Sequence, residues 1–419
     1  MAHPIIAALA KHKAGVLLIG LQIALTLAIV CNLIFIVAVQ VQRIHRPTGM
    51  DDQDLIMITQ QYLDAPTGSD TVAQQKLDAM QLTDLATLRN LPDVVSATTV
   101  NAVPLSMENW MLGVALKPDQ PHGLERVNVF TGDEQTLQTL GLRLIAGRNF
   151  TPVEVQHWMS LNHHQPAVVI VTQAMAQRLF PQGHALGQAI YIDGSSQPST
   201  VVGIVARMQS SNPDATGPAA WDSVLMPVRF DAAQTMYVVR AKPGRLPAAM
   251  QEVRKALYKV DPMRLIPEAQ RFDPEGIAPY ALWRKVGYTM DSYMVQILTT
   301  ICVILLAITG IGMAGLTSFW VGQRRKQIGI RRALGATRAN ILHYFQTENL
   351  IIAGGGCIVG AVLAIGINLA LLRMFPMNRM PLWYVAAGIA VVLALGQLAV
   401  FFPARRASNV PPVEATRSV

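Results

Sequence analysis

Charged residues are scarce in this chain. They make up only 14% of its 419 residues, whereas about a quarter of the residues in a soluble domain are charged. Cysteine is also rare, because Cys31, Cys302 and Cys357 are the three cysteines and all of them fall within apolar stretches. The polar part of the chain therefore has no cysteine for disulfide bonds, thiol chemistry or metal binding.

The chain also lacks the sequence motifs of several enzyme classes. It has no Gly-x-x-x-x-Gly-Lys-Ser/Thr phosphate loop, no Gly-x-Ser-x-Gly nucleophile elbow and no His-Glu-x-x-His pair. We therefore expect no catalytic residue, no metal site and no cofactor in this chain. His157, His163 and His164 gather in one polar stretch, but no carboxylate stands beside them at ligand spacing. A surface loop is favoured over a metal site.

Four long apolar stretches account for the low charge: Ala14–Val41, Ser292–Val321, Asn349–Leu372 and Leu382–Phe402. Each is long enough to cross a hydrocarbon core of about 30 Å as a helix. In hydrocarbon every backbone amide needs an internal partner, so a helix is the conformation expected. The expected fold is an α+β membrane protein with four transmembrane helices in 1+3 order. A large mixed α/β extracytoplasmic domain of two subdomains lies between the first and second helices.

The uneven distribution of charge predicts the topology. Residues 43–290 hold 21 Lys/Arg and 23 Asp/Glu, whereas loop 323–346 holds six Lys/Arg and no acid. Because basic loops stay in the cytoplasm, we expect both termini and this loop there and the large block outside. Arg373 and Arg379 in the short outer connection are a weak counter-signal. The basic excess flanks membrane spans, so it indicates a lipid bilayer and no nucleic-acid partner.

These observations give a linear plan of the chain. The first helix is expected to be an uncleaved signal anchor. The plan is a cytoplasmic N-terminus (1–13), helix 1 (14–41), an extracytoplasmic block (42–290) with a middle subdomain near 125–225, helix 2 with a stalk (291–322), a cytoplasmic loop (323–346), helix 3 (347–372), an outer connection (373–381), helix 4 (382–402) and a cytoplasmic tail (403–419).

Hydrophobic periodicity predicts short elements in the extracytoplasmic block. Strands are expected at Val94–Val100 and Thr235–Ala241, and a hairpin is expected around the turn at Asp193 and Gly194. Leu246–Val260 is predicted to be an amphipathic helix with one apolar face, made of Met250, Val253, Leu257 and Val260.

The basic loop has more features than topology requires. A helix is expected to continue from the second span through Arg324–Ala333, Gly335 allows a turn, and Thr337 can cap the next helix. Apolar side chains among arginines are typical of a segment that docks into a groove on a cytoplasmic protein. The candidate docking residues are Gln327, Ile328, Gly329, Ile330, Arg331, Arg332, Ala333, Leu334, Gly335, Ala336 and Arg338.

Polar and small residues within the spans are expected to hold helices together. Asn32, Asn368 and Gln397 are mild polar groups that can bond between helices. Glu348 is expected at the membrane interface. Gly356 and Gly360 form a Gly-x-x-x-Gly pattern, which fits either packing within one subunit or a dimer seam.

Three segments carry a family resemblance. Lys326-Gln-Ile-Gly-Ile-Arg-Arg-Ala-Leu-Gly-Ala-Thr-Arg338 resembles the signature of FtsX/MacB-type permeases, with Gln327 where many members have glutamate. The tail Pro403-Ala-Arg-Arg-Ala407 and the segment Thr139–Phe150 resemble the same family. The resemblance covers nearly the whole chain.

The resemblance implies a role and a set of partners. The chain would be a mechanotransmission-type permease of an ABC system in the bacterial inner membrane, and loop 323–346 would couple it to a cytoplasmic ATPase dimer. ATP and Mg would bind to that ATPase, which is expected to be a separate polypeptide. A second permease subunit, identical or paralogous, would complete the complex.

Three functions remain open at this stage. An export permease of a tripartite efflux assembly, with a periplasmic adaptor and an outer-membrane duct, is favoured by the MacB-like block. A lipoprotein-releasing permease is weakly supported by the apolar segment Trp110-Met111-Leu112. A regulator of cell-wall hydrolases is disfavoured, because such regulators have smaller external domains.

Overall fold

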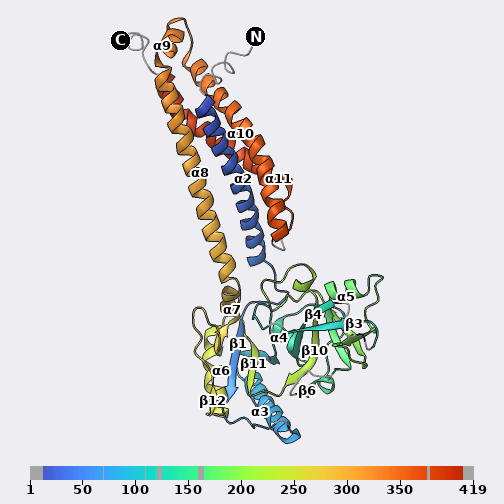
Figure 1. Cartoon of the computed structure of the whole chain (residues 1–419). Helices are drawn as coiled ribbons and strands as arrows, with labels where there is room; N and C mark the ends of the chain where they lie inside the picture. Colours follow the sequence, from blue (N-terminus) through green and yellow to red (C-terminus); the bar gives the residue numbers. More distant parts are fainter. Residues whose placement is uncertain are drawn as a thin grey trace. The chain divides into compact units, whose positions relative to one another are not determined.

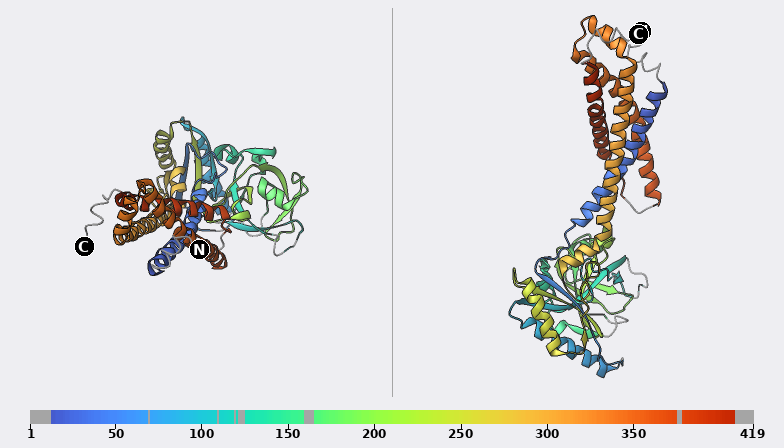
Figure 2. Two further views of the ribbon diagram at one scale, coloured as in Figure 1. Left: turned by 90° about the horizontal axis from the view of Figure 1, so that it is seen from above. Right: turned by 90° about the vertical axis from the view of Figure 1, so that its left-hand side faces the viewer.

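The computed structural model describes residues 13–68, 70–108, 110–118, 120, 125–158, 165–374 and 378–408. It divides into a helix unit, Met1–His45 with Met290–Val419, and a mixed unit, Arg46–Thr289. Figures 1 and 2 show the long helices of the first unit and the sheets of the second. Each unit is described by itself below.

The helix unit confirms the predicted 1+3 arrangement. It contains α2 (Lys13–Ile44), α8 (Thr289–Gln323), α9 (Arg325–Ala333), α10 (Arg338–Met374) and α11 (Leu382–Ser408). Helices α2, α8, α10 and α11 are long and apolar enough to cross a membrane. The apolar window of α2 is 50% buried, whereas that of α8 is 17% buried. Helix α2 is therefore central, and α8 presents most of its surface outward.

Helices α2 and α10 run parallel and approach each other through glycine. A Cβ atom added at Gly356 would lie 2.8 Å from the carbonyl oxygen of Gly20, and one added at Gly360 would lie 2.9 Å from that of Ala24. Both glycines thus pack within the subunit, against α2. Side-chain hydrogen bonds strengthen the contact, because Asn32 Nδ2 donates to the carbonyl of Ala364 over 3.0 Å. The predicted role of Asn32 in joining helices is confirmed.

Replacing Gly360 with leucine should separate α2 from α10. The side chain would overlap the α2 backbone, and overpacking of this kind costs about 1–3 kcal/mol. The measurement is the thermal unfolding midpoint of the purified protein. Gly366→Leu is the matched control on the same helix, because a Cβ there meets nothing within 4 Å. Equal midpoints for the two variants would contradict this account of the α2–α10 contact.

The mixed unit contains two sheets. The first, sheet A, has the order β12-β1-β11-β2, with β13 also paired to β1. Its strands are β1 (Leu55–Tyr62), β2 (Val94–Val100), β11 (Gln234–Ala241), β12 (Arg264–Leu265) and β13 (Ile277–Pro279). Helices α3 (Thr71–Arg89) and α6 (Leu246–Val260) pack on it around a core that includes Ile58, Leu85 and Val253.

The second, sheet B, lies between β2 and β11 in the sequence. Its order is β4-β3-β8-β9-β7-β10-β6, with β5 paired to β9. Strand β4 also pairs with β10, so the strands from β4 to β10 close into a barrel. The strands are β3 (Met111–Ala115), β4 (Glu125–Gly132), β5 (Leu144–Gly147), β6 (Gln156–Trp158), β7 (Val168–Thr172), β8 (Ala189–Ile192), β9 (Ser199–Val205) and β10 (Ser223–Phe230). Sheet B thus spans 111–230, whereas the predicted middle subdomain spanned about 125–225.

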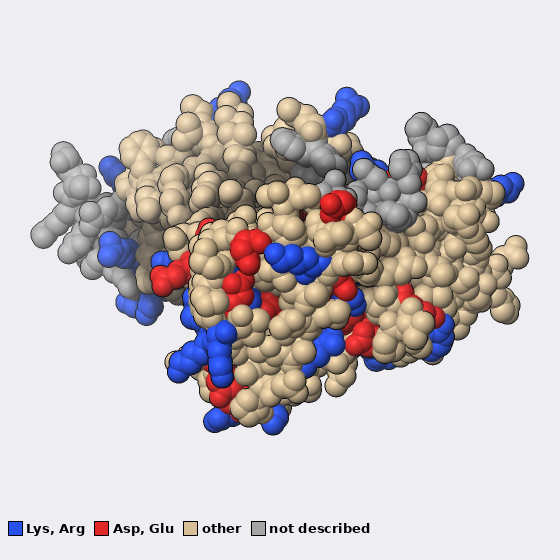
Figure 3. Space-filling model, turned by 90° about the horizontal axis from the view of Figure 1, so that it is seen from below, with Lys and Arg blue, Asp and Glu red and all other residues tan. Residues whose placement is uncertain are grey.

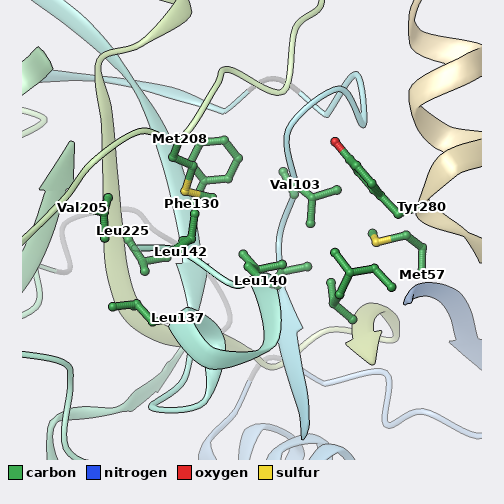
Figure 4. Close-up of a cluster of buried hydrophobic side chains, with 14 of the residues drawn as sticks. Met57, Val103, Phe130, Leu137, Leu140, Leu142, Val205, Met208, Leu225 and Tyr280 are labelled. Carbon is green, nitrogen blue, oxygen red and sulfur yellow. The ribbon is translucent and has the colours of Figure 1, made fainter. Parts of the chain in front are cut away.

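Alternation along each strand gives sheet B two apolar faces. In β4, Val127 and Val129 join one core, while Phe130 joins another. The second core is shared with sheet A, because it also contains Met57 and Val238. Figure 4 shows this shared cluster, in which Leu137 and Leu140 of α4 (Thr136–Leu140) and Tyr280 of α7 (Tyr280–Gly287) also lie. The two sheets are therefore one folded unit.

Most predicted elements of the mixed unit are confirmed. The helix at Leu246–Val260 and the strand at Val94–Val100 have the predicted bounds. Strands β8 and β9 form the predicted hairpin, and Asp193 and Gly194, with φ values of 52° and 73°, make a turn in its connection, which the amide of Ser195 closes by donating to the carbonyl of Ile192 over 3.1 Å. The remaining helix, α5, spans Gln173–Leu179, and short 3-10 turns lie at Pro152–Glu154 and Gly217–Ala220.

The predicted apolar face of α6 is partly wrong. Ala249, Val253 and Leu257 are its buried residues, whereas Val260 at the last turn is 39% exposed. A small alanine lets the helix approach the sheet closely, so the buried face is rotated toward Ala249. Val260 lies at the end of α6, next to its C-cap Asp261.

A buried charge cluster ties α3 to sheet A. Arg264 donates from Nη1 and Nη2 to the two carboxylate oxygens of Asp84, over 2.8 and 2.9 Å, and both side chains are 0% exposed. Tyr62 donates to Asp84 Oδ2 over 2.6 Å, and its hydroxyl lies 2.9 Å from that of Tyr237. Burial raises the pKa of both tyrosines, so their hydroxyls stay protonated. Sequence patterns gave no sign of this cluster.

Charge on the surface of the mixed unit is of both signs. Figure 3 shows acidic and basic side chains interspersed over the face that it views. On the described residues of that face no broad basic patch stands out, and nucleic acid binding depends on such a patch.

Candidate functional site

The basic segment between α8 and α10 folds as a separate short helix, α9. The sequence predicted that the second span continues as one helix through Ala333. Instead, Arg324 takes φ −97° and ψ 10° and caps α9, so α8 ends at Gln323. The interruption frees α9 to take its own direction, and Figure 1 shows it at the end of the helix unit where α8 stops and α10 starts.

The turn from α9 to α10 follows the predicted chemistry. Gly335 has φ +98°, a conformation that favours glycine. The amide of Ala336 donates to the carbonyl of Arg331 over 3.0 Å, which closes the end of α9. Thr337 Oγ1 accepts from the amide of Asn340 over 3.2 Å and caps α10, as predicted.

One face of α9 packs into the helix unit. Ile328 is 7% exposed and joins a small core with Ile341 and Phe345 of α10 and Val400 and Ala404 of α11. Gly329 beside it is also buried. The Arg331 guanidinium lies 4.9 Å from the ring centroid of Tyr344, a cation–π contact to α10. These residues attach α9 to its own subunit.

The other face of α9 carries exposed apolar side chains. Ile330 is 48% exposed and Leu334 is 83% exposed. They are four residues apart, so they lie on one face of the helical segment. Gln327, Ala333 and Arg338 are exposed nearby, and Arg332 and Ala336 are partly buried. The predicted docking residues thus divide into an inner group that anchors α9 and an outer group around Ile330 and Leu334.

A buried ion pair that the sequence analysis missed holds the start of α9. Arg324 Nη1 lies 2.9 Å from Glu348 Oε1 and 2.8 Å from Oε2, and the two side chains are 11% and 3% exposed. Glu348, which was expected at the membrane interface, is buried within the helix unit, where it contacts Arg324. Its isolation was the available signal, because Glu348 is the sole acidic residue of α10 and a lone charge in a span needs a partner.

The histidine stretch gains carboxylate neighbours in the fold. His157 Nδ1 lies 2.9 Å from Asp231 Oδ2, and the side-chain ligand atoms of Asp78, His157 and Asp231 all lie within 4.8 Å of one another. Asp78 and Asp231 come from distant segments, so the spacing of residues around His157 in the sequence gave no sign of them. Arg229 already bonds Asp78 over 2.6 Å, so the cluster is an ion-paired junction. His163 and His164 lie outside the described residues.

Comparisons with known proteins identify two domain families. The MacB-like periplasmic core domain matches residues 20–256, and the FtsX-like permease C-terminal domain matches residues 299–412. The second match contains α9 and its turn, and the first contains most of the mixed unit.

Individual relatives agree with these matches. The macrolide export ATP-binding/permease protein MacB of Chromobacterium violaceum is 26% identical over 66% of this chain and 41% of its own length. The pyoverdine export ATP-binding/permease protein PvdT of Pseudomonas savastanoi pv. phaseolicola is 27% identical over 60% of this chain and 38% of its own length. The chain thus spans about two fifths of the length of these relatives.

Among solved structures, the periplasmic region of MacB from Actinobacillus actinomycetemcomitans matches 52% of this chain and 89% of its own, at 14% identity and a TM-score of 0.31. The family assignment does not depend on that likeness, because one family alone matches residues 20–256, more than half of the chain. With both domain families in one polypeptide, the chain belongs to the MacB/FtsX-type family of ABC transporter permeases.

Proposed function

We propose that the chain is the permease subunit that couples ATP hydrolysis by a cytoplasmic ATPase to a conformational change of the mixed unit, and so drives export of a substrate. ATP and Mg bind to the ATPase. The relatives named above are export proteins with both ATP-binding and permease parts, and this chain matches the permease part through its two domains.

The outer face of α9 is the observation that carries this proposal. Ile330 and Leu334 expose apolar surface beside basic side chains, which suits a groove on a partner protein. The inner face and the Arg324–Glu348 pair attach α9 to α8, α10 and α11. A push on the outer face is therefore transmitted to the long helices.

The arrangement of charge supports a cytoplasmic location for α9. A Cβ at Gly15, near the start of α2, would lie 3.0 Å from Trp320 near the end of α8, and Ala404 of α11 shares a core with Ile328. The start of α2, helix α9 and the end of α11 therefore share one end of the helix unit. Lys13, Arg405 and Arg406 add basic charge there, so by the positive-inside rule this end faces the cytoplasm of a bacterial inner membrane.

Two kinds of partner follow from the proposal. A dimer of ATPase subunits contacts two α9 helices, one from each of two permease subunits, identical or paralogous. Most of the apolar surface of α8 is not buried within the subunit, so it is available to lipid and to the second permease. A periplasmic adaptor and an outer-membrane duct would complete a tripartite export assembly.

Replacing Leu334 with aspartate should detach the ATPase. A charge at the centre of an apolar contact should cost about 2 kcal/mol or more, at least a tenfold loss of affinity. The measurement is vanadate-sensitive ATP hydrolysis that co-purifies with the tagged chain from its native membrane. Leu63→Asp is the matched control, because Leu63 in the mixed unit is also exposed, at 57%. Undiminished ATPase activity with Leu334→Asp would refute the coupling role of α9.

A further inference from the structure

A cavity of about 310 Å³ opens in the mixed unit between the ends of β2 and β11 and the chain that leads into β3. Its walls include Glu108, Trp110, Phe230, Gln234 and Met236. The volume lies at the lower end of the range usual for small-molecule sites.

The cavity has an aromatic wall. The ring centroids of Trp110 and Phe230 are 5.0 Å apart, with 51° between their planes. Trp110 is held in place because its carbonyl accepts from the amide of Val129 in β4 over 2.9 Å. Its side chain is still 36% exposed, so part of the indole ring is open to a ligand. Aromatic faces attract organic cations.

The charge of the cavity has one sign. Among the described residues that line it, Glu108 is the one acidic residue, and none is a lysine or arginine. Glu108 is exposed and forms no ion pair or hydrogen bond with another described residue. Several other polar groups are already used, since Asn101 bonds the backbone of both Val129 and Thr131 in β4. A carboxylate free for a ligand therefore stands beside aromatic surface.

The segment 104–107, which leads into Glu108, is strained and held by contacts with α7. Leu105 and Met107 have φ values of 66° and 64°, a conformation that is unfavourable for residues with a side chain. Tyr280 donates from its hydroxyl to the carbonyl of Pro104 over 2.8 Å, and a Cβ at Gly287 would lie 3.1 Å from the carbonyl oxygen of Leu105. Both anchors belong to α7, which the chain joins directly to α8.

We propose that this cavity binds a small organic cation with an aromatic or apolar body. The cationic group lies against Glu108 and the faces of Trp110 and Phe230, and the apolar body contacts Met236. The statement that such cations are exported depends on the function proposed above. The statement that the cavity binds them does not depend on it.

The test uses two probes that share a ring and differ in charge, phenyltrimethylammonium and benzenesulfonate. Each is titrated into the purified full chain in zwitterionic lipid nanodiscs without nucleotide, with empty nanodiscs as the blank, and binding is followed by saturation-transfer NMR. The cation should bind and saturate, and the anion should not. Glu108→Gln and Trp110→Leu should each weaken binding of the cation about threefold to tenfold, and Glu108→Arg should abolish it.

Matched controls separate local effects from general ones. Glu275→Gln removes another exposed carboxylate and Phe272→Ala another exposed aromatic ring of the mixed unit, and neither should change the affinity. Equal binding of both probes, no binding, or full affinity in Glu108→Gln would each overturn the proposal. Such a failure would leave the ATPase result with Leu334→Asp untouched, so the two proposals fail separately.

Discussion

Replacing Asp84 with alanine should lower the free energy of opening sheet A by about 3–5 kcal/mol, because removing one partner leaves the other charge buried and unpaired. The remaining charge is the Arg264 guanidinium, which is 0% exposed. Tyr62 also loses the acceptor of its 2.6 Å hydrogen bond. The measurement is native-state hydrogen exchange of the amides in β1 and β11, which reports local opening without assuming two-state unfolding.

A double variant tells whether the stability is lost because Arg264 is left without its counter-charge or because the Asp84 side chain is missing. Asp84→Leu with Arg264→Met removes both charges, and well-packed apolar residues should recover most of the stability. Arg245→Met serves as the surface control, since Arg245 pairs with Asp93 but its side chain is 59% exposed. It should change the exchange little, because solvent screens such pairs. Exchange that is as slow in Asp84→Ala as in the wild type would show that the cluster contributes little.

Replacing Glu348 with alanine should uncouple the ATPase while leaving the mixed unit intact. Arg324 would remain largely buried without its counter-charge, so the start of α9 should move to solvate it. We expect at least a tenfold fall in co-purifying vanadate-sensitive ATPase activity and faster hydrogen exchange in α9. Leu334→Asp should lower the activity without faster exchange, because it changes the outer face alone.

The control for this prediction replaces the Arg324–Glu348 ion pair with two apolar side chains that can still attach α9 to α10. Arg324→Met with Glu348→Leu should return slow exchange in α9 and part of the activity, since the pair acts by attachment. Glu275→Ala, an exposed acid of the mixed unit, should have no effect. Slow α9 exchange in Glu348→Ala would mean that the core around Ile328 holds the helix alone.

Local patterns predicted the elements that depend on local chemistry. The four spans follow from apolar length, the turn at Gly335 from a positive φ, and the hairpin at Asp193 and Gly194 from residues that accept φ > 0. The break at Arg324 was not predictable from periodicity, because the basic residues there fit a continuing helix as well as a cap.

Contacts between residues that are far apart in the sequence could not be predicted from sequence patterns. Asp84 and Arg264 are 180 residues apart, and Asp231 meets His157 across 74. No spacing rule joins such residues, since the fold alone brings them together. For the docking segment, the sequence identified the right stretch but could not divide it, because Ile328 and Ile330 are chemically alike. Only their packing makes one an anchor and leaves the other exposed.

The interrupted order of sheet A has a consequence for how the chain folds. Strand β1 ends at Tyr62, but its neighbour β11 starts only at Gln234, after all of sheet B. During synthesis β1 therefore emerges with no neighbour to pair with, and its backbone donors and acceptors remain open to other chains. Sheet B can close first because its strands are contiguous in sequence. Strand β1 of sheet A must then pair with β11, although all of sheet B lies between the two strands in the sequence. Such long-range pairing is slow, so the nascent chain passes through an aggregation-prone interval that ends only when β11 is complete.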